Sequence, residues 1–355
     1  MTHTSIKKTL AWLFDTLLRD FRKFPKVLNY ALMSLNRTSR LHYYTYHERP
    51  KSAAEIHVDE VRHETLHLPP TALVIQGPLV DIDNFTLETV RLYRRLMPQT
   101  LIVVSTWRNA PLAIIEQLRT LGAEVVLSDP PAVSGGHNIN FQMVSTAAGI
   151  HHARKAGCEY VIKTRTDQRF HAHAVLPYLF ALLEEYPSID TTVQRHRIVE
   201  LSVSICRYRP YSMCDMFQFG HIDDLLIMWD LPLDPRSHSA AEYALQQITP
   251  RRFSEDRTGE VYVHRGYLEA IGKRTEVDLA TYYRHMADYF IVIDKEAVDL
   301  FWNKYEAREY GLAVNPLYQA WRPTAKFYSR DWYVTRKYGP EVFDTDPALM
   351  DIPEN

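Results

Sequence analysis

Short apolar runs alternate with amphipathic stretches in the first half of the chain. The apolar runs have the length of β-strands and cover residues 72–75, 101–105, 124–127 and 160–163. The stretches between them carry apolar side chains at helical spacing and cover residues 85–97, 112–121 and 140–155. Because strands that alternate with helices form a parallel sheet covered by helices, this pattern predicts an α/β fold.

The alternation is less regular beyond Asp167. Helical spacing recurs at residues 175–186, 223–230 and 240–248. Strand-like runs cover residues 201–205, 215–219 and 289–293. The second half is therefore also predicted to mix strands and helices.

The first 40 residues have a different pattern, which is amphipathic and basic. Their apolar side chains recur at spacings of three and four, at Leu10, Phe14, Leu17, Leu18, Phe21, Phe24 and Leu28. They hold eight Lys or Arg and two Asp, a net charge of +6. We expect residues 5–36 to form one or two amphipathic helices on an anionic membrane surface. A helical hairpin docked on the main domain is the alternative.

Composition limits the class of protein. The chain has 355 residues, of which 46% are hydrophobic and 24% charged, enough for a large globular core. Its formal charge of -2 excludes an overall basic protein built to neutralise nucleic acid. Its three cysteines have no paired spacing, so the sequence supports neither a disulfide framework nor a cysteine zinc site.

Residues 41–70 are polar and irregular and are interpreted as a linker. They include an HExxH pattern formed by His63, Glu64 and His67. In a zinc protease such a pattern lies on a helix, which places both histidines on one face. Pro69 and Pro70 follow almost at once and disfavour a helix. The sequence therefore favours the linker over a zinc site.

Polar residues and one glycine follow the predicted strands of the first half. They comprise Gln76 and Gly77, Ser105 and Thr106, Asp129, and the group Lys163, Arg165, Asp167 and Arg169. Asn140 and Gln142 begin the helix before the fourth strand. The sequence has neither a P-loop nor the GxGxxG fingerprint. Ligands of open parallel sheets nevertheless bind at the carboxyl ends of the strands, so these residues are candidate ligand contacts.

The segment 163–169 is the most informative of these groups. It presents one carboxylate, Asp167, among three cations. That combination suits a divalent ion or a diphosphate. A salt bridge between Asp167 and an arginine at the strand end is the structural alternative.

These segments resemble the WavE family of bacterial lipopolysaccharide-synthesis proteins, which look like GT-A type glycosyltransferases. The resemblance covers roughly residues 70–305. It is carried by residues 73–78 with Thr89, 104–107, 127–129, 138–142, 163–169, 215–220 and 241–243.

The resemblance implies a GT-A-like, Rossmann-type, mostly parallel sheet flanked by helices over residues 71–305. It also implies transfer of a sugar from a nucleotide-sugar donor to a growing lipopolysaccharide or capsular glycan, with a glycan or glycolipid as acceptor. Together with the N-terminal pattern, it places the protein in the cytoplasm, peripheral to the inner membrane.

Roles for individual residues follow from the resemblance. Asp167 would stand in the DxD motif that holds Mg or Mn, although the sequence here is Asp167-Gln168-Arg169 and lacks the second carboxylate. Lys163, Arg165 and Arg169 would assist or replace the metal at the phosphates. The remaining donor contacts would come from Gln76, Gly77, Ser105, Thr106, Asp129, Asn140 and Gln142. The candidate bases for the acceptor are Glu242, Asp223 and Asp224.

The sequence leaves two other functional classes open. Nucleotidyl or phosphoryl transfer also uses carboxylates and basic residues around phosphates, and a non-catalytic scaffold of a polysaccharide assembly complex is a third class. Residues 306–355 form an aromatic and basic C-terminal tail, which is typical of sugar or membrane contacts but equally of a tail packed across the main domain.

Overall fold

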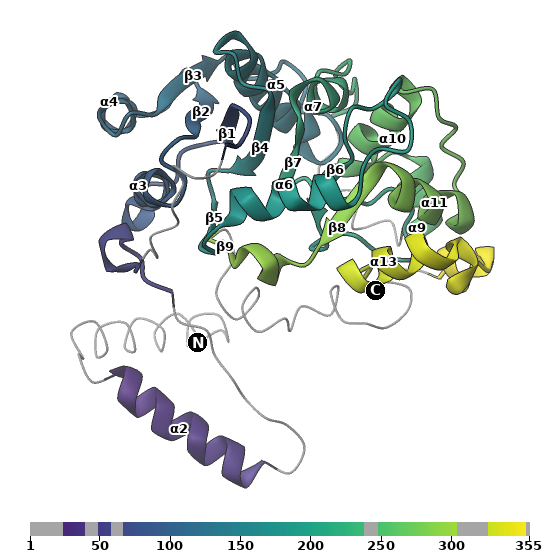
Figure 1. Cartoon of the computed structure of the whole chain (residues 1–355), viewed down its shortest axis with the longest axis horizontal. Coiled ribbons are helices and arrows are strands. Elements are labelled where there is room, and N and C mark those ends of the chain that lie inside the picture. Colours follow the sequence, from purple (N-terminus) through teal and green to yellow (C-terminus); the bar gives the residue numbers. More distant parts are fainter. Residues whose placement is uncertain (1–23, 40–48, 58–66, 238–247, 304–325, 353–355) are drawn as a thin grey trace, which may run out of the picture. The chain divides into compact units, whose positions relative to one another are not determined.

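The computed structural model describes residues 24–39, 49–57, 67–237, 248–303 and 326–352 (Figure 1). The chain divides into two compact units, Met1–Arg49 and Pro50–Asn355. His63 and Glu64 of the HExxH pattern lie outside the described residues, as do Glu242 and residues 5–23 of the predicted N-terminal helices.

In the first unit the structure describes helix α2 (Phe24–Thr38). Val27, Tyr30 and Met33 are spaced three residues apart on this helix and are 50%, 71% and 55% exposed. Because side chains three apart lie on neighbouring positions of a helix surface, the three residues form one exposed apolar stripe.

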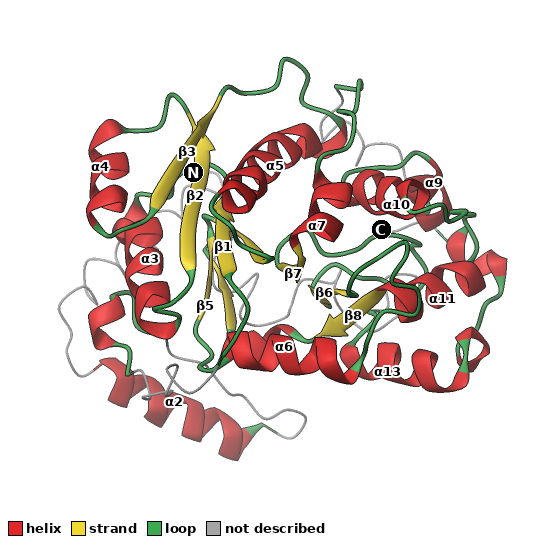
Figure 2. Cartoon of the chain, turned by 45° about the horizontal axis from the view of Figure 1, so that its top comes forward, coloured by secondary structure: helices red, strands yellow, loops and turns green. Residues whose placement is uncertain are grey.

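A seven-stranded sheet forms the centre of the second unit (Figure 2). Its strands in chain order are β1 (Thr71–Gln76), β2 (Leu101–Trp107), β3 (Glu124–Ser128), β4 (Tyr160–Arg165), β6 (Ile198–Leu201), β7 (Gln218–His221) and β8 (Phe290–Ile293). Their order across the sheet is β3-β2-β1-β4-β7-β6-β8. Only β7 runs antiparallel to its neighbours, so the predicted mostly parallel α/β fold is confirmed.

Five helices of this unit fall where the pattern of apolar side chains predicts them: α3 (Phe85–Leu96), α4 (Leu112–Thr120), α5 (Ile139–Lys155), α6 (Val175–Glu185) and α7 (Ile222–Trp229). Four further helices were not predicted: α9 (Pro250–Glu255), α10 (Glu260–Ala270), α11 (Leu279–Tyr289) and α13 (Ser329–Tyr338). The predicted helix at 240–248 falls almost wholly outside the described residues.

Helix α5 lies on the sheet over β1, β2 and β3. A Cβ atom at Gly149 would lie 2.5 Å from the Val74 Cγ1, so only glycine allows this close approach. The Ser105 hydroxyl donates a hydrogen bond of 2.6 Å to the Ser145 carbonyl and joins β2 to the same helix. These contacts fix the middle of α5 against β1 and β2.

Two strands of the second half are displaced from their predicted positions. The strand predicted at 201–205 lies at 198–201, because it pairs with β8, and β8 has only four residues. The strand predicted at 215–219 lies at 218–221, where its residues pair with 160–163 of β4. Apolar side chains extend beyond the pairing in both cases, since Val203, Ile205 and Phe217 are buried outside the ladder.

A separate two-stranded ribbon brings distant parts of the chain together. Strand β5 (Gln168–Phe170) pairs antiparallel with β9 (Leu300–Trp302). The Asn303 N–H donates to the Asp167 carbonyl at 2.8 Å. The ribbon therefore places Trp302 and Asn303 beside the end of β4.

Parts of the predicted linker and tail pack into the second unit. Ala53 is 2% exposed, and its N–H donates to Glu88 Oε2 at 2.7 Å. Trp332 of α13 is buried and donates from Nε1 to the carbonyls of Met286 and Phe290 at 3.0 and 2.8 Å. The described part of the C-terminal tail thus packs against α11 and β8.

Candidate active site

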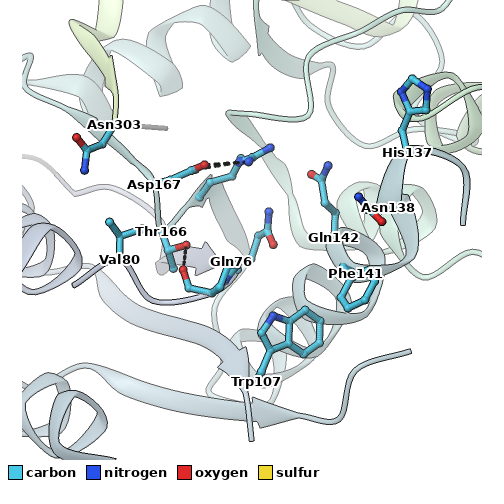
Figure 3. A pocket seen from close by; sticks show the side chains of 13 residues that line it. Gln76, Val80, Trp107, His137, Asn138, Phe141, Gln142, Thr166, Asp167 and Asn303 are labelled. Carbon is cyan, nitrogen blue, oxygen red and sulfur yellow. Dashed lines mark hydrogen bonds and ion pairs between the residues drawn. The ribbon is translucent and has the colours of Figure 1, made fainter. Parts of the chain in front are cut away.

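A cavity of about 690 Å³ opens at the carboxyl ends of β1, β2 and β4 (Figure 3). Its lining comes from the ends of these strands, from the start of α5 and from the residue after β9. The lining residues are Gln76, Gly77, Pro78, Val80, Trp107, His137, Asn138, Phe141, Gln142, Arg165, Thr166, Asp167 and Asn303. This is the edge at which ligands of open parallel sheets bind.

The backbone turn after β1 shapes one wall of the cavity. Gly77 has a φ of +119°, a backbone conformation that residues other than glycine rarely adopt. Its N–H donates to the Ser105 carbonyl at 3.0 Å. A Cβ atom there would lie 3.0 Å from the Thr166 Oγ1, whose hydroxyl donates to the Pro78 carbonyl at 2.6 Å. The turn therefore requires glycine both for its conformation and for its contact with Thr166.

Arg165 is held between two carboxylates. Its Nε and Nη2 donate to the two oxygens of Asp167, each at 3.0 Å, and its Nη1 donates to Asp215 Oδ2 at 3.1 Å. Asp167 Oδ2 also accepts a hydrogen bond of 3.0 Å from the Trp302 indole N–H. Figure 3 shows Asp167 at the cavity wall, with a dashed line that marks one of these contacts. Such two-point contacts fix the plane of the guanidinium.

Burial and charge set the protonation of this group. Burial raises the pKa of Asp215, but the charges of Arg165 and Lys163 more than offset that effect and hold it below its ordinary value. Burial lowers the pKa of Lys163 to about 8, and its ammonium donates to the Asp215 carbonyl and lies 4.3 Å from the Trp229 ring. Arg165 has a raised pKa, because the charges of Asp215 and Asp167 outweigh its desolvation.

Neutral polar and aromatic side chains line the rest of the cavity. Gln76 Oε1 accepts from the Ser145 hydroxyl at 2.8 Å. Gln142 Oε1 is buried and has no hydrogen-bond partner within the described part of the chain. Trp107 and Phe141 meet edge to face with ring centroids 5.5 Å apart. Figure 3 shows these rings on the opposite side of the cavity from Asp167.

The structure brings five of the predicted donor contacts into the cavity lining: Gln76, Gly77, Gln142, Arg165 and Asp167. Ser105 and Asn140 are fully buried and hold elements together, because Asn140 exchanges hydrogen bonds of 2.8 and 2.9 Å with the backbone of Asp234. Thr106 is also fully buried and absent from the lining. Asp129 is on the surface and pairs with Arg108 at 2.9 Å.

Two of the predicted phosphate-binding cations are also outside the lining. Lys163 is fully buried beneath Asp215. Arg169 is 2% exposed, and its guanidinium donates to Thr89 Oγ1 and to the carbonyls of Lys51 and Phe85 at 2.8–3.0 Å. Both therefore support the fold around the site, and Arg165 is the cation that reaches the lining.

Asp223 and Asp224, two candidate bases, lie at the other edge of the sheet. They follow β7, which runs antiparallel, so His221 pairs with Tyr160 at the start of β4. Asp224 is 1% exposed and accepts hydrogen bonds from the N–H groups of Arg195 and His196, each at 3.0 Å. The reversed direction of β7 separates both carboxylates from Asp167 by the length of β4. Glu242, the other candidate, is outside the described residues.

Sequence reasoning did not assign roles to Asp215, Trp302, Asn303 or Glu260. Glu260 begins α10, and a Cβ atom at the preceding Gly259 would lie 3.4 Å from the His137 Cβ at the cavity wall. Burial first, and then the charge of Asp215, raise the pKa of Glu260. A hydrophobic pattern could not have found these contacts, because they are made between segments far apart in the chain.

The lining does not fit a divalent metal ion. Mg at a phosphate site is held by one or two carboxylates together with phosphate and water oxygens, so any metal here would depend on Asp167, the one carboxylate among the lining residues. Both of its oxygens already accept hydrogen bonds from Arg165. Within the described ranges, no group of three or more His, Cys, Asp and Glu side chains could hold a metal.

Fold and site together define an α/β protein with an arginine-containing cavity at the carboxyl edge of a mostly parallel sheet. The family model described as WavE lipopolysaccharide synthesis matches residues 71–302. The chain belongs to this family, which confirms the resemblance found in the sequence. Among the helices described, none is both long and apolar enough to cross a bilayer.

Several solved structures are similar to part of the chain. TarS from S. aureus is 13% identical, with 61% of this chain and 43% of that chain covered and a TM-score of 0.35. Glucosyl-3-phosphoglycerate synthase from Mycobacterium tuberculosis, in complex with Mn2+, UDP and phosphoglyceric acid, is 11% identical, with 65% of this chain and 86% of that chain covered and a TM-score of 0.31. 4-Diphosphocytidyl-2C-methyl-D-erythritolsynthase from Anaerococcus prevotii is 10% identical, with 54% of this chain and 86% of that chain covered and a TM-score of 0.32. No curated protein sequence matches the chain significantly. With TM-scores this low, the family assignment rests on the sequence match.

Proposed function

We propose that this protein is a glycosyltransferase that moves a sugar from a nucleotide-sugar donor to a growing lipopolysaccharide or capsular glycan. The observation that carries the proposal is the position of Arg165, at the lining of a 690 Å³ cavity on the ligand-binding edge of the sheet. Membership of a lipopolysaccharide-synthesis family supports the same reaction class.

Sugar transfer needs positive charge at the donor phosphates. The acceptor hydroxyl oxygen forms a bond to the anomeric carbon while the bond from that carbon to the nucleoside diphosphate breaks. The electron pair of the broken bond stays on the terminal phosphate oxygen, which becomes more negative as the reaction proceeds. Fixed N–H donors aimed at this oxygen stabilise the transition state, and the guanidinium of Arg165 supplies them.

The wall opposite Asp167 suits the nucleoside. The Trp107 and Phe141 rings offer aromatic surface to a base or a ribose, and Gln76 lines the same cavity (Figure 3). Aromatic side chains bind bases by stacking. We therefore place the base and ribose between β1 and the start of α5, and the diphosphate nearer Arg165.

Inversion at the anomeric carbon would also require a base that takes the acceptor proton. Glu242 remains a candidate from the sequence, and Glu260 is a second candidate from the structure. A carboxylate whose pKa is raised by burial and by Asp215 accepts a proton more readily near neutral pH. If Glu260 is the base, Glu260→Gln lowers kcat by about 100-fold or more and leaves donor affinity unchanged; Glu242→Gln is the matched comparison.

We propose that the N-terminal unit associates with the cytoplasmic face of the inner membrane. The exposed stripe of Val27, Tyr30 and Met33 and the net charge of +6 over residues 1–40 support binding to an anionic bilayer surface. This location would bring the cavity to a lipid-linked acceptor.

Product analysis tests the proposed reaction. The full chain is incubated with a panel of nucleotide sugars and a membrane extract containing acceptors, and the released nucleotide is identified. Release of nucleoside diphosphate supports glycosyl transfer, and Asp167→Ala should abolish it while the circular dichroism spectrum stays unchanged. Release of pyrophosphate would instead establish nucleotidyl transfer, and absence of any nucleotide-induced thermal shift would favour a scaffold.

A further inference from the structure

We infer that Arg165 occupies the place of a divalent cation in this site, so that the donor diphosphate binds without metal. The inference rests on the proposed function and adds the means by which the phosphates are held. It concerns the charge and the hydrogen bonds of four side chains: Lys163, Arg165, Asp167 and Asp215.

The carboxylates that would attract a metal are already engaged. Asp167 accepts three hydrogen bonds of 3.0 Å, two from Arg165 and one from Trp302. Asp215 accepts one of 3.1 Å from the same guanidinium. A metal ion binding Asp167 would have to displace Arg165, whose side chain is only 17% exposed, and would cost the guanidinium one of its two carboxylate partners.

The charges of the group also balance. The carboxylates of Asp167 and Asp215 carry two negative charges, and the Arg165 guanidinium and the Lys163 ammonium carry two positive charges. The Lys163 ammonium donates to the backbone carbonyl of Asp215. Two unpaired carboxylates would attract a divalent cation strongly, whereas a group of net charge zero does not. The same neutrality removes the repulsion that bare carboxylates would exert on a diphosphate.

Donors for the phosphates remain after these contacts are made. A guanidinium carries five N–H groups, and Arg165 uses three of them toward the carboxylates described here. Helix α5 has 17 residues and begins at the cavity, where Asn138, Phe141 and Gln142 form part of the lining. The positive end of its dipole adds to the attraction for an anion. The buried, unpartnered Oε1 of Gln142 is an acceptor, so it suits a hydroxyl or N–H group of the ligand and not a phosphate oxygen.

Asp167, Asp215 and Trp302 are positioning residues in this arrangement. Asp167 and Asp215 accept from the guanidinium, Trp302 holds Asp167 through its indole N–H, and the remaining guanidinium N–H groups are left for the ligand. Arg165 is the binding residue. A role of Asp167 as metal ligand makes a different prediction, which a binding experiment can separate.

The test measures binding of inorganic pyrophosphate and of UDP to the full chain by calorimetry, with EDTA and with Mn2+. We expect each dissociation constant to agree within about threefold between the two conditions. Titration of Mn2+ into the wild-type protein, followed by the electron paramagnetic resonance of free Mn2+, should show no site with a dissociation constant below about 1 mM.

Variants distinguish the two roles of Asp167. Arg165→Met should weaken pyrophosphate binding about tenfold or more in both conditions, and Arg165→Lys should restore part of it. Asp167→Asn should weaken binding by the same factor with EDTA and with Mn2+, since it only misorients Arg165. Arg119→Met is the matched control, because Arg119 pairs with Glu116 on α4, away from the cavity lining. Circular dichroism confirms that each variant is folded.

Each outcome has a definite meaning. Binding that needs Mn2+, or an Asp167→Asn effect confined to Mn2+, overturns the inference and leaves the proposed glycosyl transfer standing. Binding of neither pyrophosphate nor UDP in either condition overturns the inference and counts against the proposed function as well. Equal binding in both conditions, lost in Arg165→Met, establishes the inference.

Discussion

The contact between α5 and the sheet gives the sharpest stability prediction. Gly149 lies where the helix crosses β1 and β2, and an added Cβ would be 2.5 Å from Val74 Cγ1 and 3.1 Å from Ser105 Cβ. Carbon atoms in contact prefer separations of roughly 3.5–4.0 Å. Val74 is fully buried and β-branched, so its side chain has little freedom to move away.

The magnitude follows from two opposing effects. Forcing one methyl group into a packed core costs about 1–3 kcal/mol. Replacing a helix-interior glycine by alanine stabilises the helix by about 1 kcal/mol. Because the overlap at Gly149 exceeds about 1 Å, we expect the upper part of the first range. Gly149→Ala should then lower the free energy of unfolding by about 1–2 kcal/mol.

Urea denaturation of the full chain, followed by tryptophan fluorescence, measures this change. Gly220→Ala is the matched control, since a Cβ there lies 3.5 Å from Ile198 Cγ1, an ordinary contact. A Gly149→Ala protein as stable as the control or the wild type would refute the packing argument.

Two further predictions concern the opposite edge of the sheet and the N-terminus. Burial raises the pKa of Asp224 to about 6 from 3.8, so the folded state holds its proton more tightly and ionisation destabilises the fold. The quantity to follow is the free energy of unfolding of the wild type minus that of Asp224→Asn. It should fall by up to about 3 kcal/mol between pH 4 and pH 6 and stay level above pH 6. A difference that rises with pH over this window would contradict the raised pKa of Asp224. Deletion of residues 1–40 should release the protein from anionic liposomes in a sedimentation assay, and unchanged co-sedimentation would disprove the proposed membrane contact.

The first half of the fold could be predicted from the sequence, because each of its strands is an apolar run and each helix has apolar side chains at helical spacing. The four strands β1–β4 all fall within a few residues of their predicted positions. The second half was harder, since buried residues such as Val203 and Phe217 lie outside any ladder. The direction of β7 is set by its pairing with β4 and leaves no local mark in the pattern.

The sequence predicted those residues of the site that directly follow a strand. Gln76, Gly77, Arg165 and Asp167 reach the cavity because the turns after β1 and β4 open onto it. Arg169 is only four residues beyond Arg165, but its guanidinium turns inward to Thr89.

The unpredicted contacts come from elsewhere in the chain. Asp215 and Trp302 reach Arg165 and Asp167 through tertiary packing, which hydrophobic periodicity does not encode.

The pairing of β5 with β9 has a consequence for synthesis of the protein on the ribosome. The Asp167 carboxylate receives its indole partner from a residue 135 positions later. Strands β1–β4 can pair as soon as they leave the exit tunnel, but the guanidinium clamp is complete only when Trp302 has emerged. A nascent chain stalled before that point would have its parallel strands in place and an unfinished binding site.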